Sequence, residues 1–301
     1  MLRTITVGLD GSSESRAAAE WAAREAQVRD LALKIVHIWE PVPEPIAQAP
    51  LLVRETHRHW TERIPREAAD GIRLRHPGVE VTSEHVAGRP SEILIEEAKN
   101  AELLVLGSRG LSGIGGFMVG SVGLAVVAHA ERPVVLVRAL EQAADEHEMD
   151  PAGIPSAASP FRPVVLGLDI ENPDETLIEF ALDAALRRAT SLRVVHGWNA
   201  PPYYAYGLSA DLELHEALAR RETTALTEVL GPWRKKFPDV EVTEESHYGT
   251  PGHHLVDASR EASLVVVGRR IRRSPFGAHI GPVAHAVLHH STAPVAVVPH
   301  H

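Results

Sequence analysis

The chain has 301 residues, with 40 acidic against 30 basic side chains, a net charge of −10 at pH 7 and no cysteine. This balance argues against a general binder of nucleic acids or anionic membranes, which needs a concentrated basic face. The lack of cysteine excludes disulfides and thiolate chemistry. Asp10 interrupts the first apolar run, so we expect no signal peptide, and no apolar stretch is long enough to span a membrane. We therefore expect a soluble, cytoplasmic protein of about two domains.

Four segments of the first half recur in the second half at a nearly constant offset of 159 or 161 residues. The matched segments begin at Thr4 and Pro163, Lys34 and Arg193, Leu103 and Leu264, and Pro133 and Pro294. Such a repeat indicates two domains of one fold. We predict domains at residues 1–140 and 161–301. Residues 141–160 are rich in alanine, proline, serine and acidic residues, and we interpret them as a linker.

In chain order, each half predicts five strands that alternate with four helices. In the first half, the strand at 4–10 precedes an alanine-rich helix at 13–30, which Ser12 or Ser13 can cap. Pro90 then opens a helix that precedes the strand at 103–107. Because such strands are apolar at every position, we expect both of their faces to be covered. We predict an α/β fold of two tandem Rossmann-like, doubly wound domains, each a five-stranded parallel sheet with helices on both faces.

The last apolar strand of each half follows a proline and has no helix after it. Such a strand leaves an open sheet edge. Pairing of two edges, either between the halves or between chains, would cover them. We therefore expect a homo-oligomer, most simply a dimer, that is formed through edge strands.

A glycine-rich segment separates the strand at 103–107 from a helix predicted at 121–130. In open α/β sheets, ligands bind beyond the carboxyl ends of the strands. Glycine lets the backbone approach an anion closely and adopt positive φ, while free N–H groups at a helix start can point at the anion. The segment lacks the lysine of a P-loop, and the residues after the first strand do not form a Gly-x-Gly-x-x-Gly motif.

The pattern Gly107-x2-Gly110-x9-Gly120-Ser121 resembles the ATP-binding type of the universal stress protein family, whose members carry Gly-x2-Gly-x9-Gly-Ser/Thr after the fourth strand. The resemblance extends over nearly all of both halves, so the chain is similar to a tandem universal stress protein. It is carried by Asp10 at the end of the first strand, His37 at the end of the second, the segment at 86–90, and Pro133 before the fifth strand.

The resemblance implies an ATP site in the first half, with Mg²⁺ alongside the phosphates and with no catalytic residue. The implied site consists of Gly8, Leu9, Asp10, Ile38, Gly107, Arg109, Gly110, Gly120, Ser121 and Val122. The first four would contact the adenine, the next three would flank the ribose and phosphates, and the last three would hold the phosphate tail. Two alternatives stay open: Asp10 as the cap of the next helix, and the glycine segment as a surface loop without a ligand.

The second half departs from this pattern. Ile271 replaces the second glycine and Pro282 replaces the serine, while Ile170 and Glu171 follow Asp169. Isoleucine adopts positive φ only at a cost of about 1–2 kcal/mol, and proline has no N–H to donate. We therefore predict that this half binds ATP poorly. The arginines at 269, 270, 272 and 273 either clamp an anion or form a solvated loop tip.

Histidines and aromatic residues give weaker signals. The pairs His285/His289 and His254/Asp257 have helical spacing but no third metal ligand, so we predict no metal site. At matching strand ends, we interpret His37 and His196 as structural hydrogen-bonding residues. The remaining aromatic residues either pack or line a cleft: Trp39, Trp198, Tyr203, Tyr204 and Tyr206.

Three functions remain as hypotheses. The first is a nucleotide-dependent regulator in a stress response, in which ATP stabilises one conformation and so changes partner binding or assembly. The second is a slow ATPase or phosphotransferase, for which no carboxylate pair or positioned base stands out. The third is an interaction scaffold without nucleotide.

Overall fold

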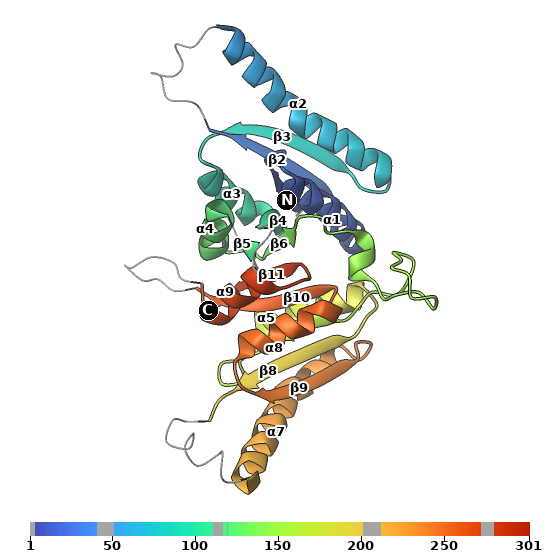
Figure 1. Ribbon diagram of the computed structural model, residues 1–301, viewed down its shortest axis with the longest axis vertical. Coiled ribbons are helices and arrows are strands. Elements are labelled where there is room, and N and C mark those ends of the chain that lie inside the picture. Colours follow the sequence, from blue (N-terminus) through green and yellow to red (C-terminus); the bar gives the residue numbers. More distant parts are fainter. Residues whose placement is uncertain (1–3, 41–50, 111–116, 119, 201–211, 272–279) are drawn as a thin grey trace. The chain divides into compact units, whose positions relative to one another are not determined.

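The computed structural model describes residues 4–40, 51–110, 117–118, 120–200, 212–271 and 280–301, and for 51–62, 109–110 and 117–118 it describes the backbone alone (Figure 1). The chain divides into two compact units, with the boundary between Gln142 and Ala143. Each unit is a doubly wound α/β domain with a five-stranded parallel sheet and helices on both faces, which confirms the predicted fold class. Within the described ranges, no helix is both long and apolar enough to cross a membrane.

The first unit alternates strands and helices as predicted. Its elements are β1 (Thr4–Leu9), α1 (Ser13–Arg29), β2 (Leu33–Trp39), α2 (Leu51–Arg75), β3 (Val81–Ala87), α3 (Pro90–Asn100), β4 (Ala101–Gly110), β5 (Phe117–Met118), α4 (Ser121–His129) and β6 (Val134–Arg138). The parallel strands have the order β3-β2-β1-β4-β6. The order reverses between β1 and β4, so the carboxyl ends of these two strands define the position where a ligand is expected.

The central strands form the core of this unit. Ile5 and Val7 of β1 and Leu104 and Val105 of β4 are fully buried. On one side of β1, Val7 pairs with Ile35 of β2, and on the other side it pairs with Val105. Strands that are apolar at every position fit this environment, because helices cover both of their faces.

Helix α1 starts where the sequence predicts. Ser12 is the N-cap, with extended backbone, and its hydroxyl accepts a hydrogen bond from the Ser15 N–H at 3.1 Å. A side-chain cap of this kind satisfies one of the N–H groups that the first helical turn leaves unpaired. The buried face of α1 is mostly alanine, which lets the helix lie close to β1 and β4.

Strand β4 runs further than predicted. It continues through Gly110, and Arg109 and Gly110 pair in antiparallel fashion with Met118 and Phe117 of β5. The glycine-rich segment therefore begins as a short antiparallel ladder. Its middle, residues 111–116, lies outside the described residues.

The second unit repeats this arrangement. Its elements are η1 (Ala143–Glu146), β7 (Val164–Gly167), α5 (Glu175–Arg187), β8 (Leu192–Trp198), α7 (Leu212–Lys236), β9 (Val242–Tyr248), α8 (Pro251–Ala258), η2 (Ser259–Glu261), β10 (Leu264–Arg270), α9 (Pro282–His290) and β11 (Val295–His300). The strand order β9-β8-β7-β10-β11 matches that of the first unit. The carboxyl ends of β7 and β10 are thus the corresponding position for a ligand.

The segment that precedes β7 has ordered structure of its own. The N–H of Glu148 donates to the Pro160 carbonyl, and the N–H of Arg162 donates to the Glu146 carbonyl, each at 2.9 Å. The His147 and Phe161 rings lie 4.1 Å apart. This segment groups with the second unit, although its composition alone suggests a linker.

Candidate functional site

A cavity of about 230 Å³ lies in the first unit at the carboxyl ends of β1 and β4. Eight of the ten predicted site residues line it: Gly8, Leu9, Asp10, Ile38, Gly107, Gly120, Ser121 and Val122. They come from β1, β2, β4 and the start of α4, which the fold brings together at the reversal of strand order. The other two predicted residues, Arg109 and Gly110, lie at the end of β4, where the structure describes the backbone alone.

The first turn of α4 is the main source of hydrogen-bond donors at the cavity. Gly120 is its N-cap, with φ −61° and ψ 156°, and no side chain caps this turn within the described residues. Ser121, Val122 and Gly123 line the cavity. The first N–H groups of a helix have no partner within the helix, and they carry the positive end of the helix dipole. This wall therefore suits an anionic group.

Neither Gly107 nor Gly120 needs glycine in order to adopt positive φ. Gly120 has an extended backbone that any residue can adopt. At Gly107, a Cβ atom would lie 2.5 Å from the Glu14 carbonyl carbon and 2.7 Å from the Ser15 nitrogen. The first turn of α1 therefore requires glycine at Gly107 whether or not a ligand is bound.

Asp10 orients the start of α1. Its Oδ1 accepts hydrogen bonds from the Ser12 N–H at 3.0 Å and from the Ser12 hydroxyl at 2.5 Å. The Ser12 hydroxyl in turn caps α1, so Ser12 is the cap and Asp10 positions it. The prediction that Asp10 could itself cap the helix is therefore wrong. Its carboxylate binds Ser12, and the Ser12 hydroxyl is the cap of α1. Asp10 is exposed and lines the cavity.

Further lining residues were not predicted from the sequence. They are Ser12, Glu14, Ser15, Val36, Pro90, Leu94, Leu106 and Gly123. The serines could have been found, because they follow Asp10 at the predicted helix start. The apolar residues carry no local signal, since Leu94 and Leu106 look like any core residue until packing places them at the cavity. Among the described residues that line it, none is basic.

The strand-end histidines make the same hydrogen bond in both units. His37 Nδ1 lies 2.7 Å from the Leu9 carbonyl oxygen, and His196 Nδ1 lies 3.0 Å from that of Leu168. Both side chains are buried. The interpretation of these residues as structural hydrogen-bonding groups is confirmed.

The corresponding position of the second unit differs in its chemistry. Gly281 caps α9 with the same φ of −61° and ψ of 156° as Gly120, but Pro282 follows and offers no N–H. A Cβ at Gly268 would lie 2.7 Å from the His300 ring, whereas Gly107 faces the α1 backbone. Helix α5 also begins later relative to its strand: Glu175 is seven residues after Leu168, and Ser13 is four residues after Leu9. Of the predicted arginines, 272 and 273 lie outside the described residues.

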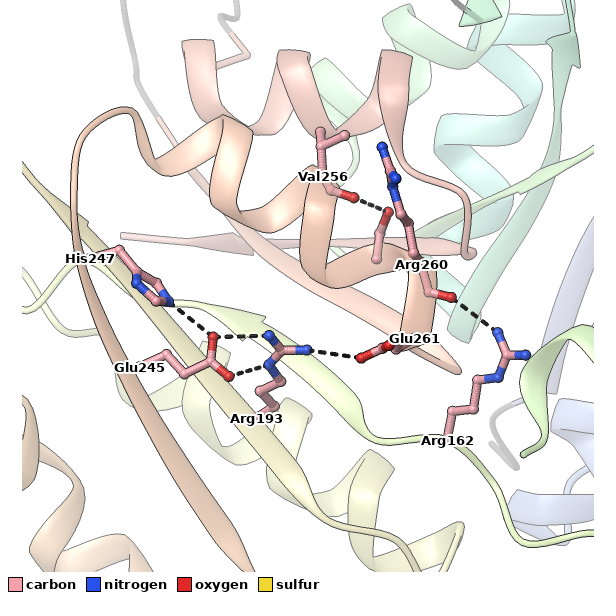
Figure 2. Close-up of polar contacts among 8 residues, drawn as sticks. Arg162, Arg193, Glu245, His247, Val256, Arg260 and Glu261 are labelled. Atoms are coloured by element: carbon pink, nitrogen blue, oxygen red, sulfur yellow. Dashed lines mark hydrogen bonds and ion pairs between the residues drawn. The ribbon is translucent and has the colours of Figure 1, made fainter. Parts of the chain in front are cut away.

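A charged network on β8, β9 and η2 is shown in Figure 2. Arg193 binds both carboxylate oxygens of Glu245, and it lies 3.8 Å from Glu261. His247 Nε2 lies 3.1 Å from Glu245. Burial acts to raise the pKa of Glu245, but the hydrogen bonds from Arg193 and His247 outweigh it, so this pKa is lowered. In the first unit the matching residue is Lys34, which pairs with Glu84 and Glu97.

Within the described part of the chain, no group of three metal-ligating side chains comes together. His285 and His289 form a ring pair 4.4 Å apart, and His254 stacks on His247 at 4.9 Å. Trp198 is buried against Tyr248, so this aromatic residue packs. The tyrosines at 203, 204 and 206 lie outside the described residues.

The fold and the cavity together define a tandem of doubly wound α/β domains whose first member has a cavity where its strand order reverses. The family model "Universal stress protein family" matches residues 1–138 and 160–299. A universal stress protein of Mycolicibacterium smegmatis is 31% identical, over 98% of this chain and 96% of its own. One of Mycobacterium tuberculosis is 32% identical, over 97% of this chain and 96% of its own.

Among solved structures, a universal stress protein from Archaeoglobus fulgidus covers 98% of this chain and 98% of its own, with a TM-score of 0.69 and 18% identity. That likeness supports the fold of the whole chain. The chain belongs to the universal stress protein family, with two copies of the family domain in tandem.

Proposed function

We propose that the first unit binds ATP and that the protein acts as a nucleotide-dependent regulator in a stress response. The observation that carries this proposal is the start of α4, which presents N–H groups without a side-chain cap at a cavity. Uncapped helix starts of this kind bind phosphate groups in many α/β folds. The cavity is smaller than the roughly 300 Å³ or more of typical ligand pockets. It therefore suits the adenosine, with the phosphates along the start of α4.

The lining residues fit a nucleotide in two further respects. Val36, Leu94 and Leu106 give an apolar surface for the base, and the Ser121 hydroxyl at the start of α4 supplies a hydrogen bond. Asp10 and Glu14 place negative charge at the same cavity, and among the described lining residues no basic side chain offsets it. A polyphosphate would be repelled there unless a cation accompanied it. We therefore propose that ATP binds with Mg²⁺, held mainly by the phosphates.

Regulation, rather than phosphate transfer, is the function that we propose. The Asp10 carboxylate already accepts two hydrogen bonds from Ser12, which is unfavourable for a general base. Binding that favours one conformation changes the population of that conformation. We propose that the protein assembles into a dimer through edge strands, in keeping with a cytoplasmic regulator.

The test is to identify nucleotide in the protein itself. Protein purified gently, without added nucleotide, is denatured and its supernatant separated by chromatography, and we expect ATP at up to one equivalent per chain. Two equivalents would contradict the prediction that the second unit binds poorly. The absence of nucleotide, together with no ATP binding by calorimetry, would favour a scaffold. Phosphate release at a rate typical of kinases, in multiple turnovers, would favour an enzyme.

A further inference from the structure

His37 lies directly beside the cavity without lining it. Its neighbours Val36 and Ile38 both line the cavity. Because side chains alternate along a strand, the His37 ring lies on the other face of β2. There it reaches the carbonyl of Leu9, its register partner on β1. Leu9 lines the cavity as well, so this hydrogen bond joins two strand ends that form the wall.

The protonation of His37 is sensitive to how tightly this region is packed. Only 5% of the residue is exposed, and burial lowers its pKa. The hydrogen bond to Leu9 raises the pKa, as does the Asp10 carboxylate at the end of β1, while His85 on β3 lowers it. Among the described residues, His85 and Asp10 are the titratable groups that act on the ring. The net pKa is lowered, so the ring is neutral at pH 7, and its Nδ1–H donates to the carbonyl.

The second unit supplies an internal comparison. His196 is 6% exposed and makes the same bond to Leu168, but its Nε2 also lies 3.5 Å from Glu222, and the residues after Leu168 follow a longer path to α5. Its unit also carries Pro282 at the start of α9. The chain therefore has two equivalent histidine bonds, one beside the cavity and one in the unit with the altered motif.

We propose that His37 is a positioning residue for the nucleotide site of the first unit: by fixing the Leu9 carbonyl, it holds the ends of β1 and β2 at the spacing that the adenosine requires. The inference rests on the proposed function. It adds that nucleotide binding is coupled to the protonation of His37. Loosening of the ends of β1 and β2 admits water to the His37 ring and favours its charged form. Bound nucleotide favours the ordered strand ends, in which the ring is neutral. Lower pH should therefore weaken binding.

The experiment measures ATP affinity of the full chain by calorimetry with constant Mg²⁺, from pH 8 to pH 5.5, and thermal unfolding of each variant. His37→Leu removes the donor, and we expect its Kd to rise about tenfold, as for the loss of one hydrogen bond. His196→Leu removes the equivalent bond in the second unit together with the contact to Glu222, and we expect at least as large a fall in Tm with an unchanged Kd. His37→Asn keeps a donor that does not titrate. We expect it to bind within about threefold of wild type, from the partial retention of that bond.

The pH profile separates positioning from a purely structural role. Protonation of the ATP phosphates affects wild type and His37→Asn alike, so the informative quantity is the difference between their pH profiles. We expect affinity to fall more steeply in wild type as pH drops below about 6.5, the usual pKa of histidine. Identical slopes, or equal changes in Kd for His37→Leu and His196→Leu, would overturn the inference while leaving the ATP site intact. No binding of ATP by wild type would overturn the proposed function and this inference with it.

Discussion

The backbone of Glu14 lies so close to Gly107 that a Cβ atom on the glycine would sit 2.5 Å from the Glu14 carbonyl carbon. One glycine of the family motif is therefore needed for the packing of α1 on β4, before any ligand is considered. The motif mixes two requirements, one for packing at Gly107 and one that we assign to the ligand at Gly120.

Gly107→Ala should destabilise the first unit. Its methyl group would meet backbone atoms, which cannot rotate away, so we expect a loss of about 1–3 kcal/mol in the free energy of unfolding. Chemical denaturation of the full chain, followed by circular dichroism, measures it. Gly268→Ala is the matched control, because its methyl group meets side-chain atoms of His300 and Leu177, which can move. Equal losses in the two variants would contradict this explanation.

Gly120→Glu should abolish ATP binding and leave the fold intact. Glutamate can adopt φ −61° without strain, but its charge would occupy the place proposed for phosphate. We expect affinity to fall about a hundredfold or more, as for two lost charge-assisted contacts. Gly281→Glu is the control, because Gly281 has the same dihedral angles and its Cβ would have no neighbour within 4 Å. Wild-type affinity in Gly120→Glu would reject the placement of the phosphates.

Ser12→Ala should loosen the start of α1 and remove the hydroxyl hydrogen bond to the Asp10 carboxylate. We expect a loss of about 1 kcal/mol in stability, the usual cost of a missing N-cap. Faster hydrogen exchange at the Ser15 amide, which donates to the Ser12 hydroxyl, is the direct measurement. In the control, Ser13→Ala, an exposed hydroxyl that binds Glu14 is removed, and the Ser15 amide should exchange as in wild type. Unchanged exchange in Ser12→Ala would show that the cap is dispensable.

Glu245→Gln should destabilise the second unit at neutral pH and less in acid. The lowered pKa of Glu245 in the folded state means that its ion pair stabilises the protein above the pKa of about 4.3 that a free glutamate has. This stabilisation is lost as pH falls through the lower folded pKa. Because both partners are partly exposed, we expect at most about 1 kcal/mol. Thermal unfolding of variant and wild type at pH 7 and pH 3 tests this, and a difference that does not shrink between pH 7 and pH 3 would contradict it.

Eight residues that line the cavity could be predicted, because the resemblance to the family assigns them to recognisable local positions. Asp10 ends a strand, Gly120 and Ser121 begin a helix, and Ile38 follows a strand-end histidine. Leu94 and Leu106 could not be predicted, because their place at the cavity depends on the packing of α3 against the sheet. The pairing of Arg109 with Met118 was also missed, since no periodic pattern marks so short a ladder.

The amino-acid sequence alone determines the repeat, the alternation of strands with helices, and the loss of an N–H donor at Pro282. Backbone preference and apolar periodicity are properties of neighbouring residues, so they can be read without the tertiary structure. Only packing decides which side chains surround the cavity, that a methyl group at Gly107 would meet the backbone of α1, and that His37 binds the carbonyl of Leu9. These relations join residues far apart in the chain, and they exist only once the strands lie side by side and exclude water.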